Sequence, residues 1–410
     1  MATNPISPAP PRDLKTPHKS TTPLKANRGT AWRGTTIVLA LIAVILYKPS
    51  PVYCEDGVID HATGLAFLSC DSMRRRYNTV MDKVIIDDTL VDGEVWMYDL
   101  EEPNVTPIKL PIPDLGVPLH PLGIAVDTHT LNPANTTTLL IANVAPGGPW
   151  IHIVRLIRDA CSPPRLHHIK TIRDPRIHTP NSIHVVPYTR ADDGTPSFFV
   201  SNDHMFLRGI PKLLENYLFL PLADLAFYNA RVGRAEVVRR GFRFTNGVTG
   251  PQNGETIYVG ESYNAAVNRF AVENVKAMNE RRSTWPILRR EGSVQVAMAV
   301  DNLDYDEGTG EVIVGGHPNG LDLLKFAKAR IPEDGVPKGM KWYPNGYRRP
   351  GSCVLKVTWG DESGKGLTME TLFSDDGSEF STSTTGMVDR GRGRMMVTGL
   401  YEYGVLDCKI

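Results

Sequence analysis

Six segments between residues 60 and 400 share one pattern of apolar and polar positions. In each segment, a turn rich in Gly, Asp, Asn or Thr leads into a short apolar strand, which ends in an aliphatic residue followed by small or polar residues. The aliphatic residues at these strand ends are Leu68, Ile141, Val200, Val259, Val314 and Val397. They are 73, 59, 59, 55 and 83 residues apart, which fits one four-stranded β-propeller blade per repeat.

The repeat predicts an all-β fold, a six-bladed β-propeller over residues 54–410. An unrelated all-β sandwich is the alternative, but it does not account for six similar strand ends. Because small residues suit a crowded axis, we expect the repeated strand to be the innermost strand of each blade. The long last interval contains a stretch rich in Lys and Pro, residues 325–351, which we interpret as an insertion with a short helix.

The first 48 residues differ from the rest. Residues 1–33 hold six basic residues, one acidic residue and six prolines, a mixture that predicts a disordered basic tail. The run 34–47 (GTTIVLALIAVILY) is uncharged and mostly apolar, although a full membrane span needs about 20 residues. We interpret residues 34–48 as an uncleaved signal anchor with the tail on the cytoplasmic side. A cleaved signal peptide and a buried core helix are the alternatives.

Either type of signal places the propeller in the secretory lumen, as a single-pass membrane protein or, after cleavage, as a secreted one. That compartment is oxidising, so the five cysteines can form disulfides. None of them has the spacing of a zinc site. The sequons at Asn104 and Asn135 are expected to carry glycans in such a compartment.

Overall charge excludes one class of partner. The 45 Lys and Arg residues balance 45 Asp and Glu residues, whereas a general nucleic-acid-binding protein carries a basic stripe. The apolar share of 41% is ordinary for a globular protein and too low for a multi-span membrane protein. We therefore expect the partners to be small molecules and, through residues 34–48, a membrane.

Carboxylate and amide side chains gather where strands end or where loops cross the propeller. The candidate ligands among them are Glu55, Asp56, Asn181, Asn246, Asp301 and Asn302. Hard oxygen ligands without cysteine or paired histidine favour calcium over zinc or copper. Taken one by one, these residues are also common turn formers, and His204 alone is more typical of a buried structural histidine.

Several stretches carry a resemblance to a known family. They are Glu55-Asp56, GLAFLS (64–69), SNDHMF (201–206), FRFTNG (242–247), VDNLDYD (300–306) and GGHPNG (315–320). Together they make residues 54–408 similar to the paraoxonase/arylesterase family. The resemblance implies a six-bladed propeller with two calcium ions in its central tunnel, lactonase and aryl esterase activity, and often an N-terminal hydrophobic anchor.

The resemblance also implies roles for individual residues. The family's ligands to the catalytic calcium match Glu55, Asn181, Asn246, Asp301 and Asn302. For the second calcium, Asp56 and the carbonyl of Ile124 match, but Ser182 stands where the family has Asp, so this ion is expected to be weakly bound or absent. His204, Phe244 and His317 match residues that line the pocket. The family's terminal disulfide implies a bond between Cys54 and Cys408.

The resemblance fails at the proposed catalytic histidine dyad of the family. The two positions are Leu122 and Val144 here, and both residues are apolar. An apolar side chain cannot act as a general base. His120, two residues before Leu122, and His204 are the remaining candidates, although His120 needs a local irregularity in its strand to reach the same place.

Three functions are compatible with these observations. The first is a membrane-tethered, calcium-dependent hydrolase of lactones or aryl esters. The second is a non-hydrolytic biosynthetic enzyme on the same scaffold, a cyclase or Diels–Alderase-like cycloaddition catalyst for a hydrophobic metabolite, which the apolar pair Leu122 and Val144 favours. The third is a ligand-binding protein without turnover. The fold alone does not choose among them.

Overall fold

Six antiparallel sheets account for most of the described chain, which comprises residues 50–102, 106–128, 136–159, 161–329, 348–360 and 366–410 of a computed structural model. Blade 1 contains β1 (Cys54–Asp60), β2 (Leu65–Cys70), β5 (Glu94–Asp99) and β6 (Ile108–Leu110). Blade 2 contains β7 (Pro121–Val126), β8 (Thr138–Asn143), β9 (Trp150–Ile157) and β10 (Arg165–Ile172). Blade 3 contains β11 (Pro180–Val186), β12 (Ser197–Asn202), β13 (Ala223–Asn229) and β14 (Arg234–Phe242).

The remaining three sheets follow the same order. Blade 4 contains β15 (Thr245–Thr249), β16 (Thr256–Glu261), β17 (Ala266–Val272) and β18 (Leu288–Gln295). Blade 5 contains β19 (Ala299–Asp306), β20 (Glu311–His317), β21 (Ser352–Thr358) and β22 (Thr368–Asp375). Blade 6 contains β23 (Ser383–Asp389), β24 (Arg394–Gly399) and β25 (Leu406–Lys409). The six-bladed propeller is thereby confirmed.

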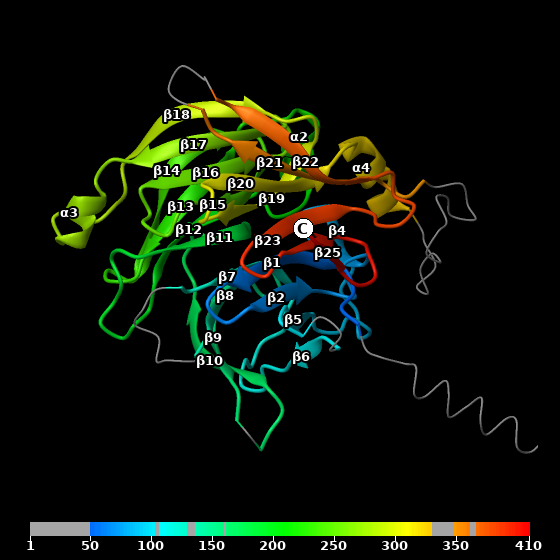
Figure 1. Ribbon diagram of the computed structural model, residues 1–410, viewed down its shortest axis with the longest axis horizontal. Coiled ribbons are helices and arrows are strands. Elements are labelled where there is room, and N and C mark those ends of the chain that lie inside the picture. The colour runs from blue at the N-terminus through cyan, green and yellow to red at the C-terminus, as the bar shows by residue number, and fades with distance from the viewer. Residues whose placement is uncertain (1–49, 103–105, 129–135, 160, 330–347, 361–365) are drawn as a thin grey trace, which may run out of the picture. The chain divides into compact units, whose positions relative to one another are not determined.

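The first strand of each blade lies at the centre of the ring. Strands β1, β7, β11, β15, β19 and β23 contact one another in this order, and β23 also contacts β1 (Figure 1). Between neighbouring blades lies a buried apolar cluster, such as the one that joins Phe67 of blade 1 to Ile141 of blade 2. The cluster that joins Ile59 of blade 1 to Met387 of blade 6 completes the circle. Burial between blades therefore holds the ring together.

The repeated strand predicted from the sequence is the second strand of each blade, so its expected innermost position is wrong. The predicted ends belong to β2, β8, β12, β16, β20 and β24. Each of these strands packs against the innermost strand of the next blade. A Cβ on Gly315 would overlap the backbone oxygen of Thr384, which explains why small residues occur at these strand ends.

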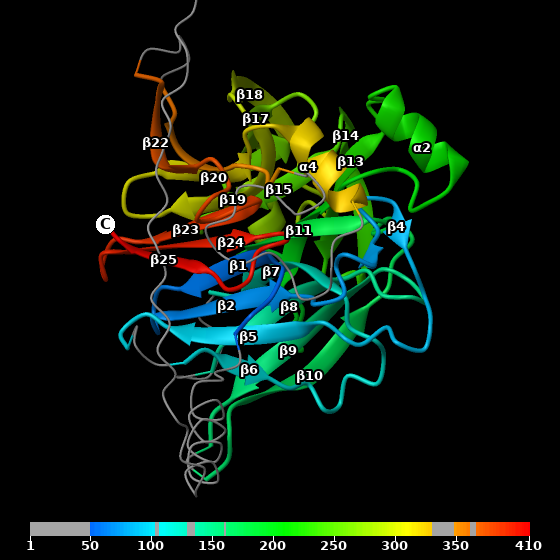
Figure 2. The ribbon, with the colours of Figure 1, turned by 90° about the vertical axis from the view of Figure 1, so that its right-hand side faces the viewer.

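Short elements gather on one side of the ring (Figure 2). They are the hairpin β3 (Tyr77–Asn78) and β4 (Lys83–Val84), with α2 (Ile210–Tyr217) and α4 (Gly320–Lys328), while α3 (Val275–Asn279) lies in blade 4 between β17 and β18. Asn319 caps α4 by accepting hydrogen bonds from the N–H groups of Leu321 and Asp322. Helix α4 overlaps the start of the 325–351 insertion, and residues 330–347 of that insertion lie outside the described residues.

Several expectations concern residues outside the described part of the chain. They are the basic tail 1–33, the anchor 34–48 and the sequons at Asn104 and Asn135. Among the described residues, no helix has both the length and the apolar character needed to cross a membrane.

The predicted disulfide between Cys54 and Cys408 is wrong. Cys54 bonds instead to Cys70, its cross-strand neighbour in the β1–β2 hairpin, with Cα atoms 3.9 Å apart. Cys408 is a free thiol on β25, which pairs with β24 in blade 6, drawn in red (Figure 2). The two ends of the propeller are joined by hydrogen bonds, including those from Tyr53 N–H to Glu402 O (2.9 Å) and from Gly404 N–H to Pro51 O (2.8 Å).

We expect the double substitution Cys54→Ser with Cys70→Ser to destabilise the protein by about 3 kcal/mol, the chain-entropy value for a loop of this size. Thermal unfolding measures the loss, and peptide mapping without reductant should recover the linked Cys54–Cys70 peptides. Cys408→Ser is the control and should change the free energy of unfolding by less than about 0.5 kcal/mol. A linked Cys54–Cys408 peptide would contradict this disulfide assignment.

Candidate functional site

Every innermost strand carries a register irregularity in its first half. The irregularities fall at Cys54/Asp56, Pro121/Ile124, Pro180/Ile183, Thr245/Val248, Val300/Leu303 and Ser383/Gly386. Such an irregularity interrupts the regular alternation of side chains and changes the direction in which the side chains within it point. Six blades therefore present residues to the centre of the ring from equivalent positions.

The five residues expected to bind the catalytic calcium all lie at these irregularities. They are Glu55 on β1, Asn181 on β11, Asn246 on β15, and Asp301 and Asn302 on β19. All five are buried, with exposed fractions of 6% or less. The Asn302 amide donates to the backbone oxygen of Glu55 (3.0 Å) and to its Oε1 (3.3 Å), although the two residues are 247 positions apart. The closed ring thus brings β1 and β19 together.

Hydrogen bonds of the side chains orient the amide groups at this centre. The amide nitrogen of Asn246 donates to Ser262 Oγ (3.2 Å), that of Asn302 to Glu55, and the Asn181 side chain hydrogen-bonds to Asp203. Among the candidate ligands, four buried oxygens have no hydrogen-bond partner: Glu55 Oε2, Asn181 Oδ1, Asn246 Oδ1 and Asn302 Oδ1. Buried acceptors without a partner are costly, so this group of oxygens fits a bound cation.

Electrostatics at the centre also favour a cation. Burial raises the pKa of Glu55 well above its ordinary value, and the neighbouring carboxylates Asp56 and Asp301 raise it further, while Arg74 opposes them. In the described part of the chain, no three His, Cys, Asp or Glu side chains form a metal-binding group. The candidate ligands are two carboxylates and three amides, a hard oxygen set that suits calcium.

The expected second calcium position does not fit an ion equally well. Asp56 Oδ2 accepts a hydrogen bond from Ile124 N–H (3.0 Å), and Oδ1 accepts from Gly57 N–H and Thr385 Oγ1 (both 2.8 Å). Ser182 supplies a hydroxyl, which already accepts from Val248 N–H (3.2 Å). The chain's own donors therefore occupy most of the acceptor capacity that a second ion would need.

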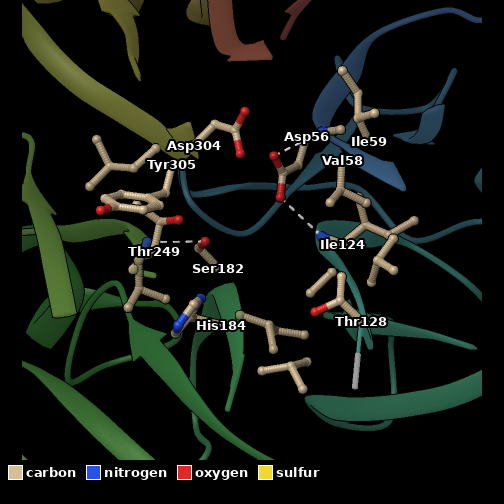
Figure 3. Close-up of a pocket in the computed structure, with 18 of the residues that line it drawn as sticks. Asp56, Val58, Ile59, Ile124, Thr128, Ser182, His184, Thr249, Asp304 and Tyr305 are labelled. Carbon is tan, nitrogen blue, oxygen red and sulfur yellow. Dashed lines mark hydrogen bonds between the residues drawn. The ribbon is translucent and has the colours of Figure 1, made fainter. Parts of the chain in front are cut away.

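This second position opens into a pocket between the innermost strands. Figure 3 shows the carboxylates of Asp56 and Asp304 pointing toward the same space, with Ser182 and His184 beyond them. Burial raises the pKa of Asp56 to about 7 and that of Asp304 to about 6. Both carboxyl groups thus become protonated more readily than an exposed aspartate.

Two histidines expected to line the site each contact a carboxylate. His204 Nδ1 lies 2.7 Å from Asp203 Oδ1, and its ring packs against Phe244 with centroids 4.7 Å apart. His317 Nε2 lies 2.8 Å from Asp301 Oδ2. The second nitrogen of each ring is buried without a partner. His204 and His317 are therefore buried, Phe244 is half-buried, and His317 contacts the carboxylate of a candidate ligand.

Leu122 and Val144, which the resemblance places at the family's dyad positions, are both buried. Leu122 lies within the irregularity of β7, and its carbonyl accepts a hydrogen bond from Ser69 Oγ. The carbonyl of Val144 accepts from the hydroxyl of Tyr77 (2.7 Å). Neither side chain can exchange a proton, so acid–base chemistry must come from other residues.

Sequence reasoning missed one partner at this site. Asp71 follows the last residue of β2 and lies 2.8 Å from the Nδ1 of His120. Asp203 follows β12 in the same way and contacts His204. The equivalent positions of Asp71 and Asp203 after the second strands of two blades could have drawn attention to Asp71.

A glycine within one irregularity permits close packing of the ligand strands. A Cβ on Gly247 would overlap the backbone nitrogen of Leu303 and approach Asn302. We expect Gly247→Ala to destabilise the protein by about 1–3 kcal/mol and to weaken the stabilisation by calcium, because the clash displaces Asn302. Calcium-titrated thermal unfolding measures both effects. Gly391→Ala, which meets only ordinary contacts, should change neither quantity.

Comparisons with known proteins point to one family. A sequence model described as Arylesterase matches residues 85–410. Serum paraoxonase/lactonase 3 of Oryctolagus cuniculus is 26% identical over 302 residues, 73% of this chain and 73% of that protein. Its Homo sapiens counterpart is 25% identical over 323 residues, covering 78% and 77% respectively. Serum paraoxonase/arylesterase 1 of Homo sapiens is 26% identical over 288 residues, covering 65% and 72%.

Proposed function

This chain belongs to the arylesterase (paraoxonase) family, and we propose that it hydrolyses lactones or aryl esters with the help of one calcium ion. Members of this family are hydrolases with a propeller fold. Relatives that are about 25% identical to this chain are named lactonase and arylesterase. The specific substrate class and the metal requirement are our proposal for this protein.

The observation that carries the proposal is the set of four buried, unpartnered oxygens at the centre of the ring. The residues that would hold the ion are Glu55, Asn181, Asn246, Asp301 and Asn302. When bound, calcium supplies a Lewis acid for the carbonyl oxygen of the ester and stabilises the negative charge that develops there.

The surrounding side chains contribute orientation and a dry environment. His317 holds one oxygen of Asp301 in place, and Asp203 orients both the amide of Asn181 and the ring of His204. Leu122 and Val144 offer an apolar wall to a hydrophobic acyl or aryl group. The candidate proton acceptors for the attacking water are His120 and His204, each of which contacts an aspartate.

The proposal is tested with the full-length chain, phenyl acetate and δ-valerolactone. We expect calcium-dependent turnover that a chelator abolishes and added calcium restores. We also expect calcium at 100 times its dissociation constant to stabilise the protein by about 2.7 kcal/mol, measured by thermal unfolding. An unchanged melting temperature with chelator would refute the calcium site, and calcium binding without turnover would refute the hydrolase.

A second candidate function follows from the same apolar pair. Leu122 and Val144 replace two proton-transferring groups, whereas the candidate calcium ligands are all present. Such a site suits cyclisation or cycloaddition of a hydrophobic metabolite, where positioning and carbonyl polarisation matter more than proton transfer. Stabilisation by calcium together with inertness toward every ester and lactone favours this function.

The location of the protein is part of the proposal. We propose that residues 34–48 tether the propeller to a membrane on the luminal or extracellular side. The Cys54–Cys70 disulfide supports an oxidising compartment. Retention in the membrane pellet after alkaline carbonate extraction, with a glycosidase-sensitive mass shift from Asn104 and Asn135, is the expected result. Release into the soluble fraction would indicate a cleaved signal.

A further inference from the structure

We propose that His120 is the general base of this enzyme and that Asp71 is its positioning residue. The inference rests on the proposed hydrolase function and identifies the group that replaces the missing dyad. His120 directly precedes β7 and is 2% exposed. Its backbone carbonyl accepts a hydrogen bond from Val144 N–H (3.1 Å), and Leu122 follows it by two residues. His120 therefore adjoins both positions where the family's histidines are absent.

The contact with Asp71 defines which nitrogen of His120 is basic. His120 Nδ1 lies 2.8 Å from Asp71 Oδ2, and both residues are buried. Because a carboxylate only accepts hydrogen bonds, it assigns the proton of the neutral ring to Nδ1 and leaves the lone pair on Nε2. Asp71 is itself held by Met73 N–H, which donates to Oδ1 (2.8 Å).

Further contacts fix the imidazole ring and its backbone. The ring of Tyr77 packs against it with centroids 4.4 Å apart, and Asn143 Oδ1 accepts from the backbone N–H of His120 (2.8 Å). Burial raises the pKa of Tyr77 to about 12, so its hydroxyl stays a donor to Val144. Arg74 approaches from the same side, where it donates to the carbonyl of Pro121 (2.7 Å).

His120 differs from His204 in the state of its second nitrogen. Nε2 of His204 is sealed from solvent without a partner. The ring of His120 hydrogen-bonds to the described residues through Nδ1 alone. Its Nε2 does not belong to the fully buried atoms without a partner. A general base has to reach water, which favours His120 over His204.

The proposed step conserves atoms and charge. His120 Nε2 accepts one proton from water as the water oxygen bonds to the ester carbonyl carbon. The same proton passes to the leaving alkoxide or phenoxide oxygen as its bond to that carbon breaks. Water and ester thus give acid and alcohol, and His120 returns to its neutral form.

The test measures phenyl acetate and δ-valerolactone hydrolysis by full-length variants with calcium present. We expect His120→Gln to lower kcat by about 10²–10⁴-fold. Asp71→Asn should also lower kcat, and its effect on KM should be smaller than its effect on kcat. The calcium-induced shift in melting temperature should persist in both variants, which shows that they are folded and retain the metal site.

Chemical rescue separates a base from a structural role. Free imidazole should restore turnover to His120→Gly. The control is His178→Gly, which removes a histidine 3.6 Å from Asp224 of blade 3, and imidazole should not affect it. Full activity of His120→Gln, or rescue of His204→Gly but not of His120→Gly, would overturn the assignment of His120 alone. Absence of hydrolysis by the unmodified protein would overturn the proposed function as well.

Discussion

Replacing Asp301 with alanine should abolish the stabilisation by calcium and lower ester hydrolysis by about 10³-fold. The substitution removes one of two carboxylates from the candidate calcium site and leaves His317 without its partner. Loss of one group that stabilises the developing oxyanion typically costs about 10²–10³-fold in rate, and weaker calcium binding adds to this loss. Calcium-titrated thermal unfolding and turnover of phenyl acetate measure the two effects.

A matched control lies on the same strand. Asp304 is three residues from Asp301 on β19, and its carboxyl faces the pocket below the candidate calcium site. Asp304→Ala removes a half-buried carboxylate without removing a candidate ligand, so the calcium-induced shift should remain. An equal shift in Asp301→Ala and in the unmodified protein would remove Asp301 from the calcium site.

Introducing both family histidines should restore hydrolysis to a protein that lacks His120. In the His120→Gln background, Leu122→His with Val144→His is expected to raise kcat by about 10²–10⁴-fold, the usual contribution of a general base. In the unmodified background the gain should be smaller, because His120 already accepts the proton. Steady-state kinetics on δ-valerolactone compare the four proteins.

The single substitutions are the controls for this experiment. Leu122 and Val144 are both buried, so each imidazole carries a cost of burial that thermal unfolding reports. Folded, calcium-responsive triple variants without any gain in kcat would show that the tunnel geometry differs from that of the family. A full gain in the unmodified background would instead argue that His120 contributes no base.

The sequence alone singles out the candidate ligands because their signals are local. VDNLDYD and GGHPNG mark blade 5 without reference to the rest of the chain, and Glu55 directly precedes Asp56 in the first strand. What the motifs could not provide is the orientation of each side chain. The Asn246 carbonyl is free for a cation because its amide nitrogen bonds to Ser262, a contact between neighbouring strands of blade 4.

The disulfide shows the limit of reasoning by family resemblance. Cys54 and Cys408 occupy the two ends of the propeller, as a ring-closing pair requires. A hairpin places Cys70 directly opposite Cys54, whereas Cys408 lies on β25, the third strand outward in blade 6, which pairs with β24. Cysteine pairing depends on Cα distance, which spacing in the sequence does not report.

The sequence by itself determined the number of blades and the hard-oxygen character of the site, because strand-end patterns and ligand types are properties of short segments. Only the tertiary structure decided which strand of each blade is innermost, since that order depends on packing against the next blade. It also decided that His120 meets Asp71, 49 residues away, across the boundary between blades 1 and 2. Contacts of this kind form only when neighbouring blades pack together, because no single blade contains both partners.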